Sequence, residues 1–224
     1  MTVSWDSNTA KKSKVLEPRK RRKQAGAKSA KPLVVFFVEG QSEKSYIKAL
    51  REFRYDNEIA FEFPNERGTS LKNLVDACRR AAKAGKLRGS SGTWIVCDVD
   101  RNEDHFDDCD KWQRKDKEKN RIALSNPCLE YWLLLHFTSS PKCSSANAAL
   151  DELKRHWPEY KKGLEPSKGF EEKIVEKTDD AVGRETTRQS SMRRDPSAWP
   201  DGPGSQMPAL IAWLDELLEG ARKG

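Results

Sequence analysis

Two short apolar segments that end abruptly in acidic residues constrain the fold of this chain more than any other feature. The first, at 33–38, is followed by Glu39, and the second, at 94–98, ends in Asp98 and is followed by Asp100. A strand buried on both faces reads as a continuous β-branched and aromatic run, and it tolerates an acid only where it emerges into a cleft. If the two strands are neighbours, the three carboxylates surround one point.

The alternation of such segments with helical patterns predicts the fold class. Strands are expected at 33–38, 59–63, 94–98 and 122–124, and the helices between and after them at about 42–53, 70–84, 106–119 and 128–137. This order predicts an α/β fold with a four-stranded, mostly parallel sheet and helices on both faces. Ligands of such sheets bind beyond the carboxyl ends of the strands.

Three helix starts carry capping signals. Ser42 is expected to cap the first helix, Thr69 or Ser70 the second, and Asn126 the helix that Pro127 opens. In the second helix, the stripe Leu71, Leu74, Val75, Cys78 and Ala82 is expected to face the core, and Gly85 to end the helix.

Charge divides the chain into three parts. Residues 11–31 carry ten Lys or Arg against one acid, whereas the whole chain has a net charge of +7. We therefore expect a disordered basic tail at 1–31, an α/β domain at 32–140 that carries the strand-end acids, and a helical and irregular extension at 141–224 that packs on the core. Within the extension, helices are expected at 146–157, near 168–180, and from about 207 to Gly220, with 158–206 otherwise irregular.

The remaining composition points to a cytoplasmic protein without a membrane partner. The five cysteines show no C-x-x-C pairing, so reduced thiols are expected. No apolar run reaches membrane-spanning length, and the N-terminus lacks a signal-peptide core. The basic run Arg19, Lys20, Arg21, Arg22 and Lys23 suits non-specific contact with a nucleic acid backbone, although a solvated tail is the simpler alternative.

The strand-end acids predict chemistry on phosphates. Clustered carboxylates repel one another, and a hard divalent cation, Mg²⁺ or Mn²⁺, is the usual source of their stability. Asp98 and Asp100 point the same way on an extended segment, so they can share one metal. Glu39, on the other strand, can be a ligand or a general base. The alternative is that these acids are turn formers or helix caps.

Two acids in first helical turns are further candidates. Glu130 lies near the start of the helix after the fourth strand. It can be a metal ligand, either of the same metal or of a second one, or it can interact favourably with the helix dipole. Glu43 has the same two interpretations in the first helix.

Candidates for contact with nucleic acid lie beside these acids. Lys44 follows Glu43, and Arg101 follows Asp100 and can bind a phosphate or pair with Asp104. His105 can shuttle a proton or bind phosphate, or it can be a plain loop residue. His136, on an apolar helix, is expected to be a core residue.

Three motifs resemble the RloB-like family. They are Val35–Glu43, Asp98–Arg101 with His105 nearby, and Ser125–Phe137. The resemblance spans roughly 32–137, with a weaker similarity at 207–218. Val99 stands where family members often have Arg. Members occur beside phage-defence genes, and the family resembles Toprim domains, in which a glutamate and an Asp-x-Asp bind Mg²⁺ for phosphodiester chemistry. The resemblance implies that Glu39, Asp98 and Asp100 form the metal and catalytic centre.

These observations predict a Mg²⁺-dependent nuclease of bacterial anti-phage defence that cuts RNA, tRNA included, or DNA. One alternative is a non-catalytic subunit of a defence complex that binds nucleic acid or a partner protein and keeps a vestigial acidic site. Another is a nucleotidyl or phosphoryl transferase that acts on a small nucleotide. The sequence carries no signal for the oligomeric state.

Overall fold

The computed structural model describes residues 30–64, 70–99, 105–162, 168–192 and 200–223, with side chains at 168–170 left out. Lys31–Gly224 groups as one unit, separate from Met1–Ala30. The expected basic tail therefore lies almost wholly outside the described residues. No helix in the described ranges is both long and apolar enough to cross a bilayer.

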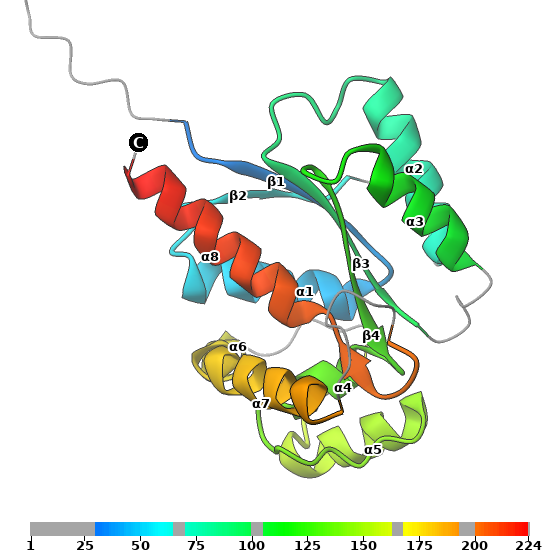
Figure 1. The fold of residues 1–224 in the computed structure, drawn as a ribbon. Helices are drawn as coiled ribbons and strands as arrows, with labels where there is room; N and C mark the ends of the chain where they lie inside the picture. The colour runs from blue at the N-terminus through cyan, green and yellow to red at the C-terminus, as the bar shows by residue number, and fades with distance from the viewer. Residues whose placement is uncertain (1–29, 65–69, 100–104, 163–167, 193–199, 224) are drawn as a thin grey trace, which may run out of the picture. The chain divides into compact units, whose positions relative to one another are not determined.

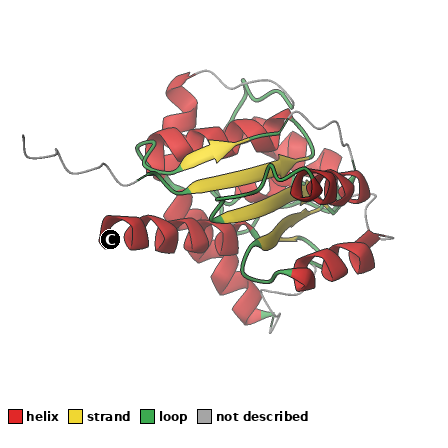
Figure 2. Cartoon of the chain, turned by 90° about the horizontal axis from the view of Figure 1, so that it is seen from above, coloured by secondary structure: helices red, strands yellow, loops and turns green. Residues whose placement is uncertain are grey.

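A five-stranded sheet in the order β2-β1-β3-β4-β5 forms the centre of the fold (Figure 2). The strands are β1 (Leu33–Val38), β2 (Ala60–Glu62), β3 (Gly92–Asp98), β4 (Asn120–Asn126) and β5 (Gly204–Ser205). The first four run parallel, and β5 pairs antiparallel with β4. The mostly parallel α/β fold is confirmed, but the count of four strands was wrong. The extra strand has two residues, and its Gly-Ser sequence carries no strand signal.

The register of the central strands sets where their acids emerge. Val38 of β1 lies opposite Val96 of β3, and Asp98 lies opposite Ser125 of β4. Glu39 continues the ladder by one residue, because its backbone N–H donates to the carbonyl of Val96 at 3.2 Å. Since parallel strands end at one edge, Glu39 and Asp98 leave the sheet side by side.

Helices cover both faces of the sheet (Figure 1). On one face, α2 (Leu71–Lys83) and α3 (Phe106–Lys115) pack on residues such as Val35 and Ile95. The opposite face, with Phe36 and Trp94, packs against helices from both ends of the chain. These are α1 (Gln41–Ala49), the π-helical turn η1 (Leu50–Arg54), α4 (Leu129–Leu134) and α8 (Met207–Lys223), with α5 (Ala146–His156), α6 (Lys168–Glu176) and α7 (Thr178–Ser191) packed next to them.

The structure confirms one of the three helix N-caps that the sequence predicted. Ser70 caps α2 by accepting from the backbone N–H of Asn73. Ser42 lies inside α1, which begins after Gly40, and Asn126 is the last residue of β4, where it donates to the carbonyl of Pro200. In α2, Ala81 faces the core rather than the expected Ala82.

Several helix bounds also differ from expectation. The third helix ends at Lys115 rather than 119, and the fourth is limited to Leu129–Leu134 rather than 128–137. The single helix expected near 168–180 is two, α6 and α7, and the last helix continues beyond Gly220 to Lys223.

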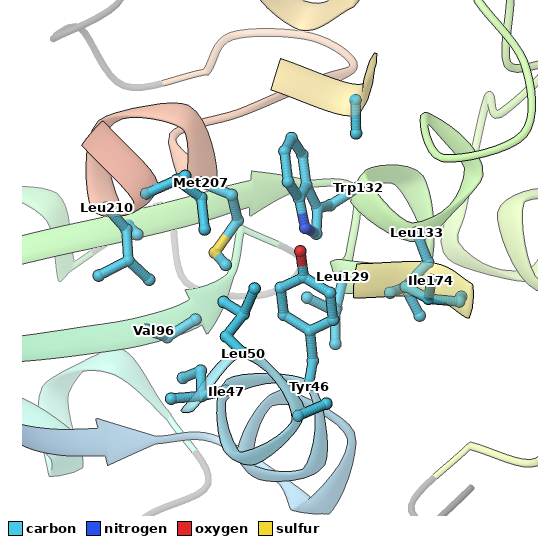
Figure 3. Close-up of a cluster of buried hydrophobic side chains, with 14 of the residues drawn as sticks. Tyr46, Ile47, Leu50, Val96, Leu129, Trp132, Leu133, Ile174, Met207 and Leu210 are labelled. Carbon is cyan, nitrogen blue, oxygen red and sulfur yellow. The ribbon is translucent and has the colours of Figure 1, made fainter. Parts of the chain in front are cut away.

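The larger core joins elements from distant parts of the chain. Figure 3 shows Tyr46 of α1 reaching towards the indole of Trp132 in α4, with Leu129 and Met207 beside them. His136 is buried here, with Nε2 3.2 Å from the Tyr46 hydroxyl, and burial lowers its pKa to about 4. It is therefore a neutral core residue, as expected from the sequence.

A buried polar network attaches the C-terminal region to the sheet. The carboxylate of Glu185, on α7, is fully buried and accepts from the Tyr131 hydroxyl at 2.5 Å. It also accepts from Gln189 Nε2 at 2.9 Å and from the backbone N–H of Ser205 at 2.8 Å. One side chain thereby links α4, α7 and β5, so α7 and β5 belong to the ordered core, whereas irregular structure was expected there.

Substituting Glu185 tests this linkage. Glu185→Ala leaves the Tyr131 hydroxyl and the Ser205 amide without this acceptor, while Gln189 Nε2 keeps its bond to the Ser205 carbonyl. We expect the substitution to lower the free energy of unfolding in urea by about 3 kcal/mol. Glu172→Ala, at an exposed position of α6, is the matched control and should change stability by less than about 0.5 kcal/mol. Equal small effects of the two substitutions would contradict the assigned role.

Candidate functional site

Glu39 lies against the end of β3. Its Oε2 accepts from the backbone N–H of Asp98 at 3.1 Å and from the Cys97 thiol at 2.8 Å. The side chain that follows β1 is thus held on the neighbouring strand, and the structure brings Glu39 and Asp98 together.

Asp98 connects this strand end to α4. The residue is 8% exposed, and its Oδ1 accepts from the backbone N–H of Leu129, the first residue of α4, at 2.8 Å. Its other oxygen, Oδ2, lies 3.9 Å from the ammonium of Lys162. One carboxylate oxygen is therefore engaged by the fold and the other faces a charge.

Glu130 is the most deeply buried acid of the group. It is 0% exposed, and its Oε1 accepts from the Tyr160 hydroxyl at 2.8 Å. Its Oε2 is buried without a hydrogen-bond partner among the described residues, and the Lys162 ammonium lies 3.6 Å away. Burying a charged carboxylate oxygen without a hydrogen bond costs free energy unless a cation lies near it.

Glu43 completes the cluster from the first turn of α1, where it is 4% exposed. A Cβ placed on Gly40 would lie only 2.9 Å from Glu43 Oε2. The turn between β1 and α1 therefore favours glycine, because any side chain there would displace this carboxylate.

The electrostatics show that the four acids share one environment. Burial, followed by the charges of Glu43, Glu39 and Glu130, raises the pKa of Asp98 well above its usual range, and Lys162 opposes the rise. Burial also raises the pKa of Glu43 to about 7, with further contributions from Glu39 and Glu130. Glu43 therefore takes up a proton near neutral pH, and Asp98 does so above its usual range.

The cysteines beside the cluster remain thiols. Burial and then the charge of Glu39 raise the pKa of Cys97, and burial with the charges of Glu130 and Asp98 raises that of Cys128. A thiol with a raised pKa is a poor nucleophile and a poor metal ligand, so both act as neutral neighbours of the acids.

Sequence reasoning missed Tyr160 and Lys162. Tyr160 is 5% exposed, packs on the ring of Trp157 at 4.9 Å, and has its hydroxyl 3.4 Å from Ser42 Oγ. Burial tends to lower the pKa of Lys162, but the charges of Glu130 and Asp98 outweigh it and raise that pKa. The aromatic pair after α5 was the one signal that this segment returns to the core.

The other predicted site residues are spread more widely. Lys44 Nζ lies 5.5 Å from the centroid of the Phe63 ring and is partly exposed. His105, also partly exposed, directly precedes α3. The remaining predicted positions lie outside the described residues: Asp100, Arg101, Arg19, Lys20, Arg21, Arg22 and Lys23.

The donor set suits a hard divalent cation. Within the described ranges, no group of three or more His, Cys, Asp or Glu side chains is arranged so that it could hold a metal ion. The clustered groups nevertheless supply the carboxylate oxygens that Mg²⁺ prefers. Glu130 Oε2 is buried without a hydrogen bond among the described residues, and the pKa values of Asp98 and Glu43 are raised, so a cation near these oxygens would lower the cost of their charges.

The model of the family described as RloB-like protein matches residues 34–214. Because this covers most of the chain, the protein belongs to the RloB-like family. The match continues through 158–206, well beyond the motifs that carried the resemblance, and so includes Tyr160, Lys162 and Glu185. No curated protein and no solved structure matches the chain.

The raised pKa of Glu43 predicts the sign of a pH dependence. Between the ordinary value of 4.5 and about 7, the folded protein binds more protons at Glu43 than the unfolded chain does. Raising the pH through this window in EDTA therefore removes the stability that Glu43 contributes. His136, whose pKa is lowered to about 4, contributes in the opposite direction, so the effect of Glu43 is read from the difference between the parent and a Glu43 variant. Glu43→Gln should remove up to about 3 kcal/mol of the loss due to Glu43, measured by urea unfolding across the window.

Glu172→Gln, at an exposed site, is the matched control and should retain the parent's pH profile. Asp98, whose pKa is raised in the same direction, leaves some dependence in Glu43→Gln. A pH profile of Glu43→Gln that matches the parent's through this window would contradict the interpretation.

Proposed function

We propose that this protein is a metal-dependent phosphodiesterase, a nuclease for RNA or DNA that acts in bacterial anti-phage defence on a Toprim-like sheet. One observation carries the proposal: Glu39, Glu43, Asp98 and Glu130 come from three separate segments to one edge of a parallel sheet. There burial and the neighbouring carboxylates raise the pKa values of Asp98 and Glu43. Membership of the RloB-like family and the Asp-x-Asp spacing support it.

The roles of the described acids are inferred from the positions of their oxygens, and that of Asp100 from its spacing to Asp98 in the sequence. Glu39, Asp98 and Asp100 would hold Mg²⁺ or Mn²⁺, with Glu130 and Glu43 as further ligands. When bound, the metal would neutralise charge on a phosphodiester and lower the pKa of a water. Leu129 holds Asp98 Oδ1 and thereby leaves Oδ2 for the centre, and Tyr160 fixes Glu130 Oε1. Glu43 can hold or release a proton near neutral pH.

Substrate and partners are inferred from charge and family. The basic run at 19–23, together with Lys44, Arg101 and His105, would contact the phosphate backbone of a nucleic acid in the cytoplasm. A partner protein of the defence system would restrain the activity until infection.

A second function is favoured by Lys162. Its ammonium already lies near Asp98 and Glu130, as expected if an acidic site has been neutralised and kept for structural reasons. The protein would then be a non-catalytic subunit that binds nucleic acid or a partner. Its discriminating feature is independence of metal: as long as the variant folds, Asp98→Ala would leave both partner binding and protection against phage unchanged.

Cleavage assays test the first function. We expect the purified protein with Mg²⁺ or Mn²⁺ to cleave RNA or DNA, and Glu39→Gln and Asp98→Asn each to lower the rate by about 100-fold or more, because each removes a charged ligand. EDTA should abolish cleavage. Asp151→Asn, at an exposed position of α5, is the control and should keep the parent's rate.

The activity must also depend on the centre in cells. Glu39→Gln should lose protection in a phage challenge while the Asp151→Asn control retains it. Full protection by Glu39→Gln, together with no cleavage of any nucleic acid by the parent, would exclude the nuclease.

A further inference from the structure

We propose that Lys162 is an internal counter-cation of the carboxylate cluster, which a divalent cation must displace in order to bind. The inference rests on the proposed function, since it concerns how the same centre is controlled. In this proposal the Lys162 ammonium and a divalent cation from solution compete for the same carboxylates.

The distances place the lysine charge among the acids. Lys162 Nζ lies 3.6 Å from Glu130 Oε2 and 3.9 Å from Asp98 Oδ2. Both distances exceed that of a direct hydrogen bond, so the pairing is electrostatic and weakly directional. Because Glu130 Oε2 has no hydrogen-bond partner among the described residues, the ammonium is the group that compensates this buried oxygen.

In the segment that carries Lys162, Tyr160 is fixed in the core whereas Lys162 reaches solvent. Tyr160 is buried and bound to Glu130 Oε1, whereas the side chain of Lys162, two residues later, is 50% exposed. The aliphatic stem can therefore turn into solvent by rotation about its own bonds while Tyr160 keeps the segment docked.

The Lys162 ammonium and a metal ion repel each other if both lie beside the oxygens of Asp98 and Glu130. A Mg²⁺ ion would lie about 2.1 Å from a ligand oxygen. An ammonium held at the present distances from the same oxygens would then lie only a few ångströms from the dication, where their repulsion is strong. Binding of the metal therefore requires Lys162 to leave, and until then the lysine stabilises the metal-free fold.

The first test compares Lys162→Met with Lys161→Met. Both substitutions remove one charge, but Lys161 is the exposed neighbour without a contact to the cluster among the described residues. By calorimetric titration with Mn²⁺, we expect Lys162→Met to bind about tenfold or more tightly than the parent, and Lys161→Met to bind like it. In EDTA, Lys162→Met should melt at a lower temperature than the parent, and Mn²⁺ should raise its melting temperature more.

The second test uses the unaltered protein, and so does not depend on folding of a variant. Amines are acetylated with and without saturating Mn²⁺, and modification is quantified at each lysine by mass spectrometry. Displacement predicts that Mn²⁺ increases acetylation of Lys162 while that of Lys161 stays constant.

The outcomes separate the inference from the proposed function. If the parent binds Mn²⁺, but Lys162→Met binds it with equal or lower affinity and Lys162 stays protected in the metal-bound protein, the lysine works beside the metal and the inference is wrong while the function stands. If neither the parent nor Lys162→Met binds Mn²⁺, both are wrong. Tighter binding by Lys162→Met with metal-induced exposure of Lys162 supports the displacement.

Discussion

Asp98 at the end of β3 is the position on which the rest of the centre depends. Its backbone N–H binds Glu39 from β1, its Oδ1 binds the first amide of α4, and its Oδ2 faces Lys162 from the segment after α5. Burying acids together costs free energy, so this arrangement persists only where amides and a cation compensate it. The end of β3 supplies the amide of Asp98, the start of α4 supplies the amide of Leu129, and Lys162 supplies a positive charge.

The strands could be predicted because buried parallel strands have a local sequence pattern. The continuous run Leu33–Val38 has the bounds of β1, and β3 ends at Asp98 as expected. No such pattern exists for β5, whose pairing with β4 depends on tertiary bonds of Ser205 and Gln206. Ser42 carried a capping signal but lies inside α1, with its hydroxyl near Tyr160, because Gly40 starts the helix two residues earlier.

The site was predictable to the extent that strand ends determine it. Glu39 and Asp98 follow from the rule that acids at the carboxyl ends of neighbouring strands meet, whereas Glu130 and Glu43 were equally consistent with helix dipoles. The contribution of Glu130 to the raised pKa values of Glu43 and Asp98 appears only in three dimensions. Tyr160 and Lys162 were missed since their partner, Glu130, lies about thirty residues earlier and no local pattern joins them.

The central claim is that a divalent cation binds between the ends of β1 and β3. The most direct measurement is the anomalous diffraction of a crystal grown with Mn²⁺. The account predicts an anomalous peak about 2.1 Å from oxygens of Asp98 and Glu39, with the ammonium of Lys162 turned away from Asp98 and Glu130. A map without a peak at these carboxylates, with Lys162 still beside them, would contradict it.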